Sequence, residues 1–228
     1  MRTLPDSITL GTPEGWSDFP IDPSDFGEFR AHLLKECRGT GDLKRSDERA
    51  LELFVTNLHR KLQADRVLYI AGIAELVRED ETAEPELFSA SVAVSTVSRA
   101  EIGVDAPLLA DVLVKVFGGD SELGDDSIKF DDIEPPSKVT VAGLEAVRLV
   151  RLLRSAEPSK QDYRQFCETF LFPVAEGDGV VLLQFATLNL EFAKQFSEVF
   201  GQVAQTLKLL YPEDATPLGE HAFNASGI

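Results

Sequence analysis

The stretch that decides the fold is VVLLQFATL at residues 180–188, which is followed by Asn189 and an amphipathic run to Leu210. A continuous apolar run of this length is typical of a buried β-strand. After Asn189, apolar side chains recur at three- and four-residue steps, the spacing that lines one face of a helix. They are Phe192, Phe196, Val199, Phe200, Val203 and Leu207. Asn189 is expected to cap this helix through its side-chain oxygen.

Further strand patterns precede this strand–helix pair and follow one another as hairpins. They cover residues 66–77, 88–96, 128–133, 138–141, 144–154 and 163–174, with a turn at 176–179 before the closing strand. Another helix is expected from Pro107 to Phe117. Consecutive hairpins with inserted helices favour an α+β fold, with a mainly antiparallel sheet and helices packed on one face.

Two helices are predicted near the start of the chain. Asp22-Pro23 combines a capping carboxylate with a proline suited to the first helical position. The second helix is expected to begin at Ser46, after the glycine-containing stretch 39–41. We therefore expect a helical hairpin at 23–63, inserted before a core at 66–210. The single domain would cover 1–210, with a disordered tail at 211–228.

Composition limits the possible partners. The 228 residues carry a formal net charge of -17, which disfavours binding to nucleic acid or to an anionic membrane. The two cysteines, Cys37 and Cys167, are far apart and make no disulfide framework. No signal-peptide pattern is visible, and no apolar run approaches the roughly 18 residues of a membrane span. We expect an acidic cytoplasmic protein.

The order of elements over residues 66–210 resembles the PsbP/DcrB-like superfamily. The resemblance is carried by the turn hairpin VTVAGLEAVR at 139–148, by the antiparallel strands after it and by the closing strand–helix pair. A helical hairpin at 23–63 is not a standard part of that fold. Members of the superfamily mostly bind proteins and share no catalytic apparatus. The resemblance therefore implies a protein-binding role and supplies no site residue.

No pattern in the chain fixes a reaction. The histidines His32, His59 and His221 lack the spacing of a zinc site, and we expect them to be solvated. An acidic run lacks the EF-hand ligand spacing and is expected to be a solvated loop. Its members are Asp120, Glu122, Asp125, Asp126, Asp131 and Asp132. We predict a protein that is not an enzyme and has no cofactor, metal or catalytic residue.

Two groups of residues are candidates for binding. In an alternating strand, Arg148 and Arg154 share one face and Arg151 takes the other, and arginine on an open face binds carboxylates. The alternative is that the acids of the chain itself balance these arginines. The aromatic residues Phe166 and Phe170, with Phe172, either line an apolar pocket or belong to the core.

Three functions remain open at this stage. The first is a binding, adaptor or chaperone-like protein that presents a groove between the sheet and the helical hairpin to a protein partner, basic or secreted. The second is a small-molecule-binding protein or an enzyme with an apolar pocket. The third is a subunit of a larger assembly, with Phe26, Phe29 and Phe54 at an interface.

Overall fold

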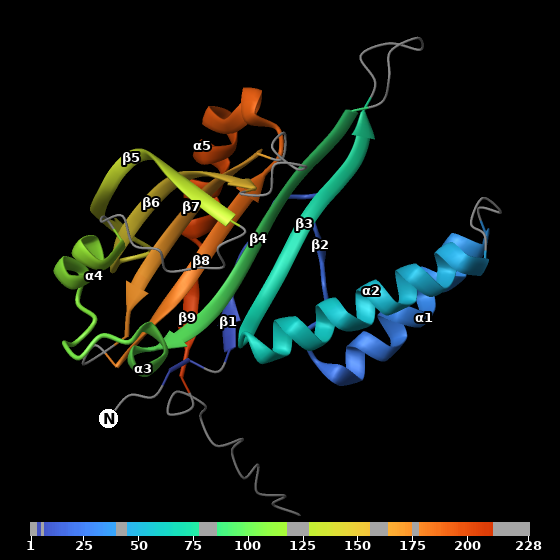
Figure 1. Ribbon diagram of the computed structural model, residues 1–228, viewed down its shortest axis with the longest axis horizontal. Coiled ribbons are helices and arrows are strands. Elements are labelled where there is room, and N and C mark those ends of the chain that lie inside the picture. Colours follow the sequence, from blue (N-terminus) through green and yellow to red (C-terminus); the bar gives the residue numbers. More distant parts are fainter. Residues whose placement is uncertain are drawn as a thin grey trace, which may run out of the picture.

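A large antiparallel sheet organises the molecule. A computed structural model describes residues 4–5, 7–39, 45–77, 86–117, 128–155, 164–174 and 178–211. Seven strands pair in the order β2-β3-β4-β8-β7-β6-β5 (Figure 1). They are β2 (Ser17–Asp18), β3 (Val67–Val77), β4 (Glu86–Ser98), β5 (Ile128–Val141), β6 (Leu144–Ser155), β7 (Arg164–Pro173) and β8 (Gly179–Thr187). The predicted antiparallel sheet is confirmed, and its most apolar strand, β8, lies centrally.

Helix α5 (Ala193–Ala204) covers one face of this sheet, after a short 3-10 turn, η3 (Leu190–Phe192). Phe200 is fully buried, and its ring stacks on Phe185 of β8 with 4.7 Å between the ring centroids. Phe196 and Val203 are buried with it in the larger core cluster. The three- and four-residue spacing of the sequence therefore identified the buried face of this helix correctly.

Helix α4 (Ala110–Phe117) covers the opposite face of the sheet, so the prediction that all helices pack on one face is wrong. Leu108 and Leu113 pack there on Val147, Leu149 and other side chains of β6, β7 and β8. Successive side chains of a strand point to opposite faces. Because β6, β7 and β8 are apolar on both faces, each face needs a cover. A short helix, α3 (Arg99–Ile102), leads from β4 towards α4.

Helices α1 (Pro23–Gly39) and α2 (Arg45–Ala64) lie side by side and extend away from the sheet (Figure 1). Strands β1 (Ser7–Thr9) and β2 come before them, so the chain begins with strands rather than with helices. The predicted start of α1 holds, because Ser24 N donates to Asp22 Oδ1 at 2.8 Å. The hydrogen bond from the Ser24 hydroxyl, and then this one from the Ser24 backbone N–H, lower the pKa of Asp22.

The end of the chain differs from the sequence prediction. Helix α5 stops at Ala204, and Lys208–Leu210 form strand β9, which pairs with β1. Asn189 makes no side-chain cap, because its side chain accepts from Ser89 N and donates to Leu87 O on β4. The expected break near Pro135 is also wrong. Strand β5 continues there with two register shifts, which an edge strand tolerates.

Several predicted features lie outside the described residues. They are His221, residues 120–127 of the acidic run, residues 176–177 of the last turn and all but Tyr211 of the expected tail.

We expect Phe200→Ala to lower the free energy of unfolding by about 3–5 kcal/mol, because it leaves a cavity between α5 and the sheet. Urea denaturation followed by circular dichroism measures this change. Phe192→Ala is the matched control, since Phe192 lies in η3, directly before α5, and is 44% exposed. Its expected cost is about 1 kcal/mol or less. Equal losses in the two variants would contradict the central role of Phe200.

Candidate functional site

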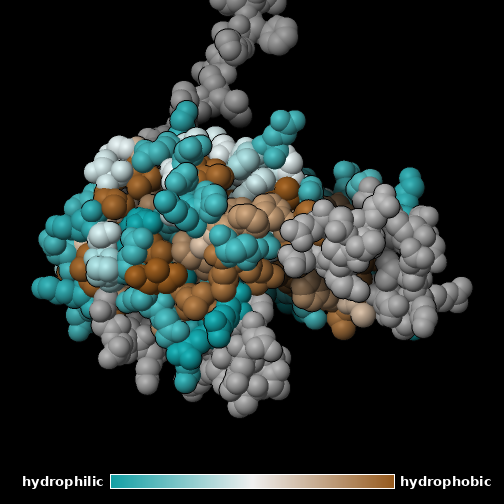
Figure 2. Space-filling model, turned by 90° about the horizontal axis from the view of Figure 1, so that it is seen from above, coloured by the Kyte–Doolittle hydropathy of each residue, from teal (hydrophilic) through white to brown (hydrophobic). Residues whose placement is uncertain are grey.

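A groove of about 620 Å³ lies between the sheet and helix α2. Its floor comes from β3, β4 and β8, and its walls include Phe19 and Leu58. Figure 2 shows hydrophobic surface in the middle of its view, between the body of the sheet and the helical pair. We call this concavity the groove throughout.

The floor of the groove is a register row of small side chains. Gly72 pairs with Ser91, Ser91 with Ala186, and Ala186 with Cys167, across four neighbouring strands. Paired residues of an antiparallel sheet point to the same face. Because none of these side chains is large, the surface of the sheet is hollow along the row.

Gly72 is required by the close approach of β3 to β4. A Cβ atom at this position would lie 2.7 Å from the carbonyl oxygen of Ala90, which is backbone and cannot move aside. The neighbouring pair Ala74 and Ser89 is also small and lines the groove. Cys167, at the end of the row, is a free buried thiol whose pKa is raised to about 11 by burial.

Helix α2 provides an apolar wall. Leu58 lines the groove, and Phe54, one turn away on the same side of the helix, is 64% exposed. Val55 and Leu62 of the same helix are buried. The apolar side chains of α2 are therefore packed in the fold at Val55 and Leu62 and open at Phe54.

His59 belongs to the packed side of α2, so the prediction of a solvated histidine is wrong for this residue. It is 7% exposed, its ring stacks on Phe26 at 3.8 Å between centroids, and its Nε2 lies 2.8 Å from the carbonyl oxygen of Ile21. The chain around α1 supplies both contacts, which the spacing of histidines could not reveal. His32 is exposed, as expected.

Polar contacts fix the end of the groove. Thr187 is buried and donates its hydroxyl to the carbonyl oxygen of Ser89 at 2.6 Å, and it accepts from Asn189 N at 3.1 Å. Asn189 in turn holds Ser89 and Leu87. These bonds join β4 to the chain after β8. Glu75 is the charged residue among those that line the groove.

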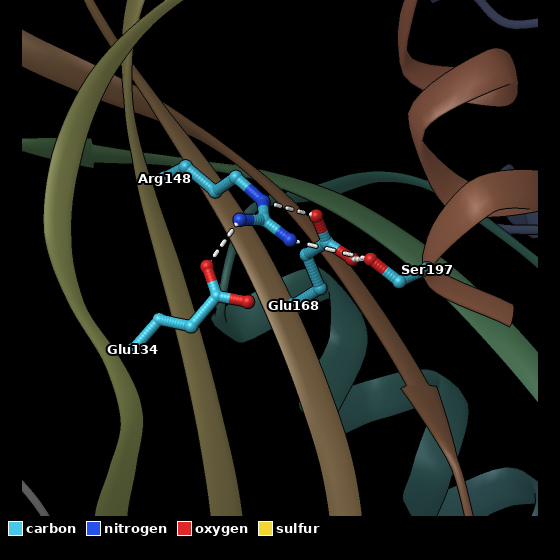
Figure 3. Close-up of polar contacts among 4 residues, drawn as sticks. All are labelled: Glu134, Arg148, Glu168 and Ser197. Carbon is cyan, nitrogen blue, oxygen red and sulfur yellow. Dashed lines mark hydrogen bonds and ion pairs between the residues drawn. The ribbon is translucent and has the colours of Figure 1, made fainter. Parts of the chain in front are cut away.

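A second polar cluster lies under α5 on the other face (Figure 3). Arg148 donates Nε to Glu168 Oε1 at 2.5 Å and Nη1 to Glu134 Oε2 at 2.6 Å. Ser197 of α5 donates to Glu168 Oε2 at 2.7 Å. Burial disfavours the charge of Arg148, but the hydrogen bonds and charges of Glu168 and Glu134 outweigh it and raise its pKa. The cluster is satisfied internally and joins α5 to the sheet.

The other candidate arginines are paired in the same way. Arg151, on the face towards α4, donates to Asp132 Oδ1 at 2.6 Å and to the carbonyl oxygen of Phe117. Arg154 pairs with Asp131, with 2.7 Å between its Nε and Oδ2. Asp131 and Asp132 of the acidic run are thus ion-paired on β5. Acids of the chain itself balance all three arginines, which is the alternative that the sequence left open.

The candidate aromatic residues are core. Phe166 and Phe170 are 5% and 3% exposed, and they pack with Phe172 in the cluster under α5. They line no part of the groove, which lies on the other face of the sheet. The binding candidates of the sequence analysis include neither Leu58 nor the floor of the groove. The sequence signal of the floor is the recurrence of Gly, Ser and Ala in β3 and β4.

The described residues hold no cluster of His, Cys, Asp and Glu that could bind a metal ion. None of the described helices combines the length and apolar content that a membrane-spanning helix needs.

Neither a protein-family model nor a curated protein sequence matches this chain. Among solved structures, the fold is similar to the crystal structure of LpqN, which is involved in cell envelope biogenesis of Mycobacterium tuberculosis. The TM-score is 0.43 and the sequence identity 12%, over 89% of this chain and 83% of that chain. A likeness at this level carries no argument about function, and the resemblance to the PsbP/DcrB-like superfamily stays a prediction.

We expect Arg148→Met to lower the free energy of unfolding by about 3–5 kcal/mol, because it leaves the carboxylate of Glu168 buried without its cation. The side chain of Glu168 is 2% exposed. Arg154→Met is the matched control, with an expected cost of about 1 kcal/mol or less, since that pair is half exposed. Urea denaturation compares them. Adding Glu168→Leu should recover part of the loss, and no recovery would argue against an unpaired charge as its cause.

Tyr69 links β3 to β2, because its hydroxyl donates to Asp18 Oδ1 at 2.5 Å. Burial, and then the carboxylate of Asp18, raise the pKa of Tyr69 from 10.0 to about 12. The neutral phenol therefore stabilises the fold fully below about pH 10, and this contribution is lost as the pH rises through about 12.

The measurement is the free energy of unfolding of the wild type minus that of Tyr69→Phe, across alkaline pH. We expect a constant positive difference up to about pH 10, and a decrease above it. Other titrating groups are common to both proteins and cancel. A difference that does not change over this range would contradict the shifted pKa.

Proposed function

We propose that this chain is a non-catalytic binding protein, an adaptor or chaperone-like factor that holds an apolar segment of a protein partner in the groove. The observation that carries the proposal is the row of small side chains Gly72, Ser91 and Ala186 beside the apolar wall of α2. Large side chains of a partner would fill a hollow that the chain itself leaves unfilled. Burial of such anchors contributes most of the affinity at protein interfaces.

The charge of the chain supports a basic partner. A formal net charge of -17 favours association with cationic proteins and opposes nucleic acid and anionic membranes. The arginines Arg148, Arg151 and Arg154 are occupied by carboxylates of the fold, so the proposal does not use them as the binding site. The cytoplasmic location expected from the sequence is part of this proposal.

A second candidate is an apolar small molecule in the same groove. The volume of about 620 Å³ favours it, since small-molecule sites commonly measure about 300–1,000 Å³. This candidate uses Leu58 and the small-residue floor rather than Phe166 and Phe170. If this candidate is correct, the purified protein retains a small molecule, whereas the first candidate requires a protein partner.

A pull-down from the native host with matched variants tests both candidates. The tagged wild type, two groove variants and one control are compared, and mass spectrometry identifies the eluted proteins and retained small molecules. Leu58→Ser removes the wall and Ser91→Leu fills the floor. Leu144→Ser is the control, since Leu144 is 38% exposed at the distant turn between β5 and β6.

We expect a protein partner with the wild type and the control, and an affinity of the purified partner at least about tenfold weaker for both groove variants. Circular dichroism and thermal melting must show that all four proteins are folded. Equal retention by groove variants and wild type would refute the use of the groove. A retained small molecule without a protein partner would support the second candidate.

A further inference from the structure

The two edges of the large sheet differ in how they are protected against strand pairing. Strand β5 forms one edge and carries the features that prevent another strand from adding to it. These are the consecutive prolines Pro135 and Pro136, register shifts on both sides of Glu134, and charged residues at Lys129 and Asp131. The edge at β5 is therefore unsuited to a strand from a partner.

The other edge lacks these features. Strand β3 has the sequence VLYIAGIAELV, with no proline or lysine, and Glu75 is its one charged residue. Strand β2 covers only its middle, by pairing with Ala71 and Gly72. Over residues 73–77, no described strand pairs with the outer side of β3. The turn before β2 reaches Ile73, where a Cβ at Gly15 would lie 3.8 Å from Ile73 Cδ1, and Figure 1 shows the rest of the strand without a neighbouring strand there.

The backbone groups that face outward can be assigned from the register. The carbonyl oxygen of Ile70 accepts from Phe19 N at 2.9 Å, so the backbone groups of Ile70 face the β2 side. Backbone groups alternate between the two sides of a strand. The N–H and C=O of Ala74 and Leu76 therefore point to the same outer side, beyond the end of β2, while β4 pairs on the inner side.

This outer edge adjoins the groove. Ile73, Ala74 and Glu75 line the groove together with Ser17 of β2. A segment that paired with the edge in line with β2 would place alternate side chains on the same face of the sheet as the small-residue floor, at the open side of the groove. Glu75 is exposed at that place and favours a basic residue in the segment.

We propose that the outer edge of β3 at residues 73–77 docks an extended segment of a protein partner, apolar and basic in alternation, as an added strand. The proposal rests on the proposed function, because the added strand belongs to the same partner and presents its apolar side chains at the open side of the groove. Main-chain hydrogen bonds to Ala74 and Leu76 supply affinity, and the groove selects the side chains. A second copy of this chain is a poor occupant, because two chains of charge -17 repel each other.

The first test changes one backbone donor. Ala74→Pro removes the outward N–H and places the proline ring in the path of an added strand. The β3–β4 ladder keeps its hydrogen bonds, since the N–H of residue 74 faces away from β4, and edge strands tolerate proline there. Ala74→Ser is the matched control, because it changes the side chain at the same position and keeps the N–H.

The probe is a fluorescent synthetic peptide of alternating valine and lysine, long enough to span residues 73–77, and fluorescence anisotropy measures its affinity. We expect saturable binding to the wild type and to Ala74→Ser, within about twofold of each other, and at least about tenfold weaker binding to Ala74→Pro. A peptide of alternating valine and glutamate should bind more weakly than the lysine peptide. No saturable binding of the lysine peptide to the wild type would overturn the proposal.

A second measurement uses the unaltered protein and does not depend on the folding of any variant. Two forms of the peptide carry N-methyl groups, one on all valine amides and the other on all lysine amides. In an added strand only one of these sets faces β3, so we expect one form to bind at least about tenfold more weakly than the other. Equal affinities would overturn strand addition.

The outcomes separate this proposal from the proposed function. If Ala74→Pro binds the purified partner like the wild type while Leu58→Ser does not bind it, the partner uses the groove but does not add a strand to β3. The proposed function then stands and the strand-addition proposal fails. If both variants keep the partner, both proposals fail. A wild type that is dimeric in solution and becomes monomeric as Ala74→Pro would assign the edge to a second copy and overturn the partner segment.

Discussion

Strand β8 is buried on both faces, and the layers of the molecule follow from that constraint. Phe185 packs under α5, whereas Val180 packs under α4 on the opposite face. The strand pairs with β4 on one side and with β7 on the other. A strand in this position exposes neither its backbone groups nor its side chains to water, so hairpins on both sides and helices on both faces are needed to complete its burial.

The charged groups of the sheet largely stabilise the fold. Glu168 is buried beneath α5 and requires Arg148 as its cation, while Ser197 fixes the helix to the pair. Arg151 similarly joins β6 to β5 and to the end of α4. Because these groups satisfy one another, the three arginines of β6 add no free charge to the binding surface that we propose at the groove.

The groove and the adjacent edge have a common origin in the composition of β3 and β4. Small side chains at Gly72 and Ser91 let the strands approach closely and leave the sheet hollow on one face. Strand β3 also lacks the prolines and lysines that protect an edge, and Glu75 is its one charged residue. The hollow and the proposed docking edge therefore lie on the same strand.

The sequence by itself determined most of the strands and helices, because hydrophobic period and turn residues act over a few neighbours. It did not determine strand β9 or the continuity of β5. It determined the antiparallel sheet, the buried face of α5 and the cap at Asp22. Only the tertiary structure decided that α4 packs on the second face of the sheet and that His59 is buried. It also decided that Asn189 hydrogen-bonds to β4 rather than capping a helix. The small-residue floor of the groove also belongs to this second class. It aligns residues far apart in the sequence, and strand register, which no local pattern contains, brings them together.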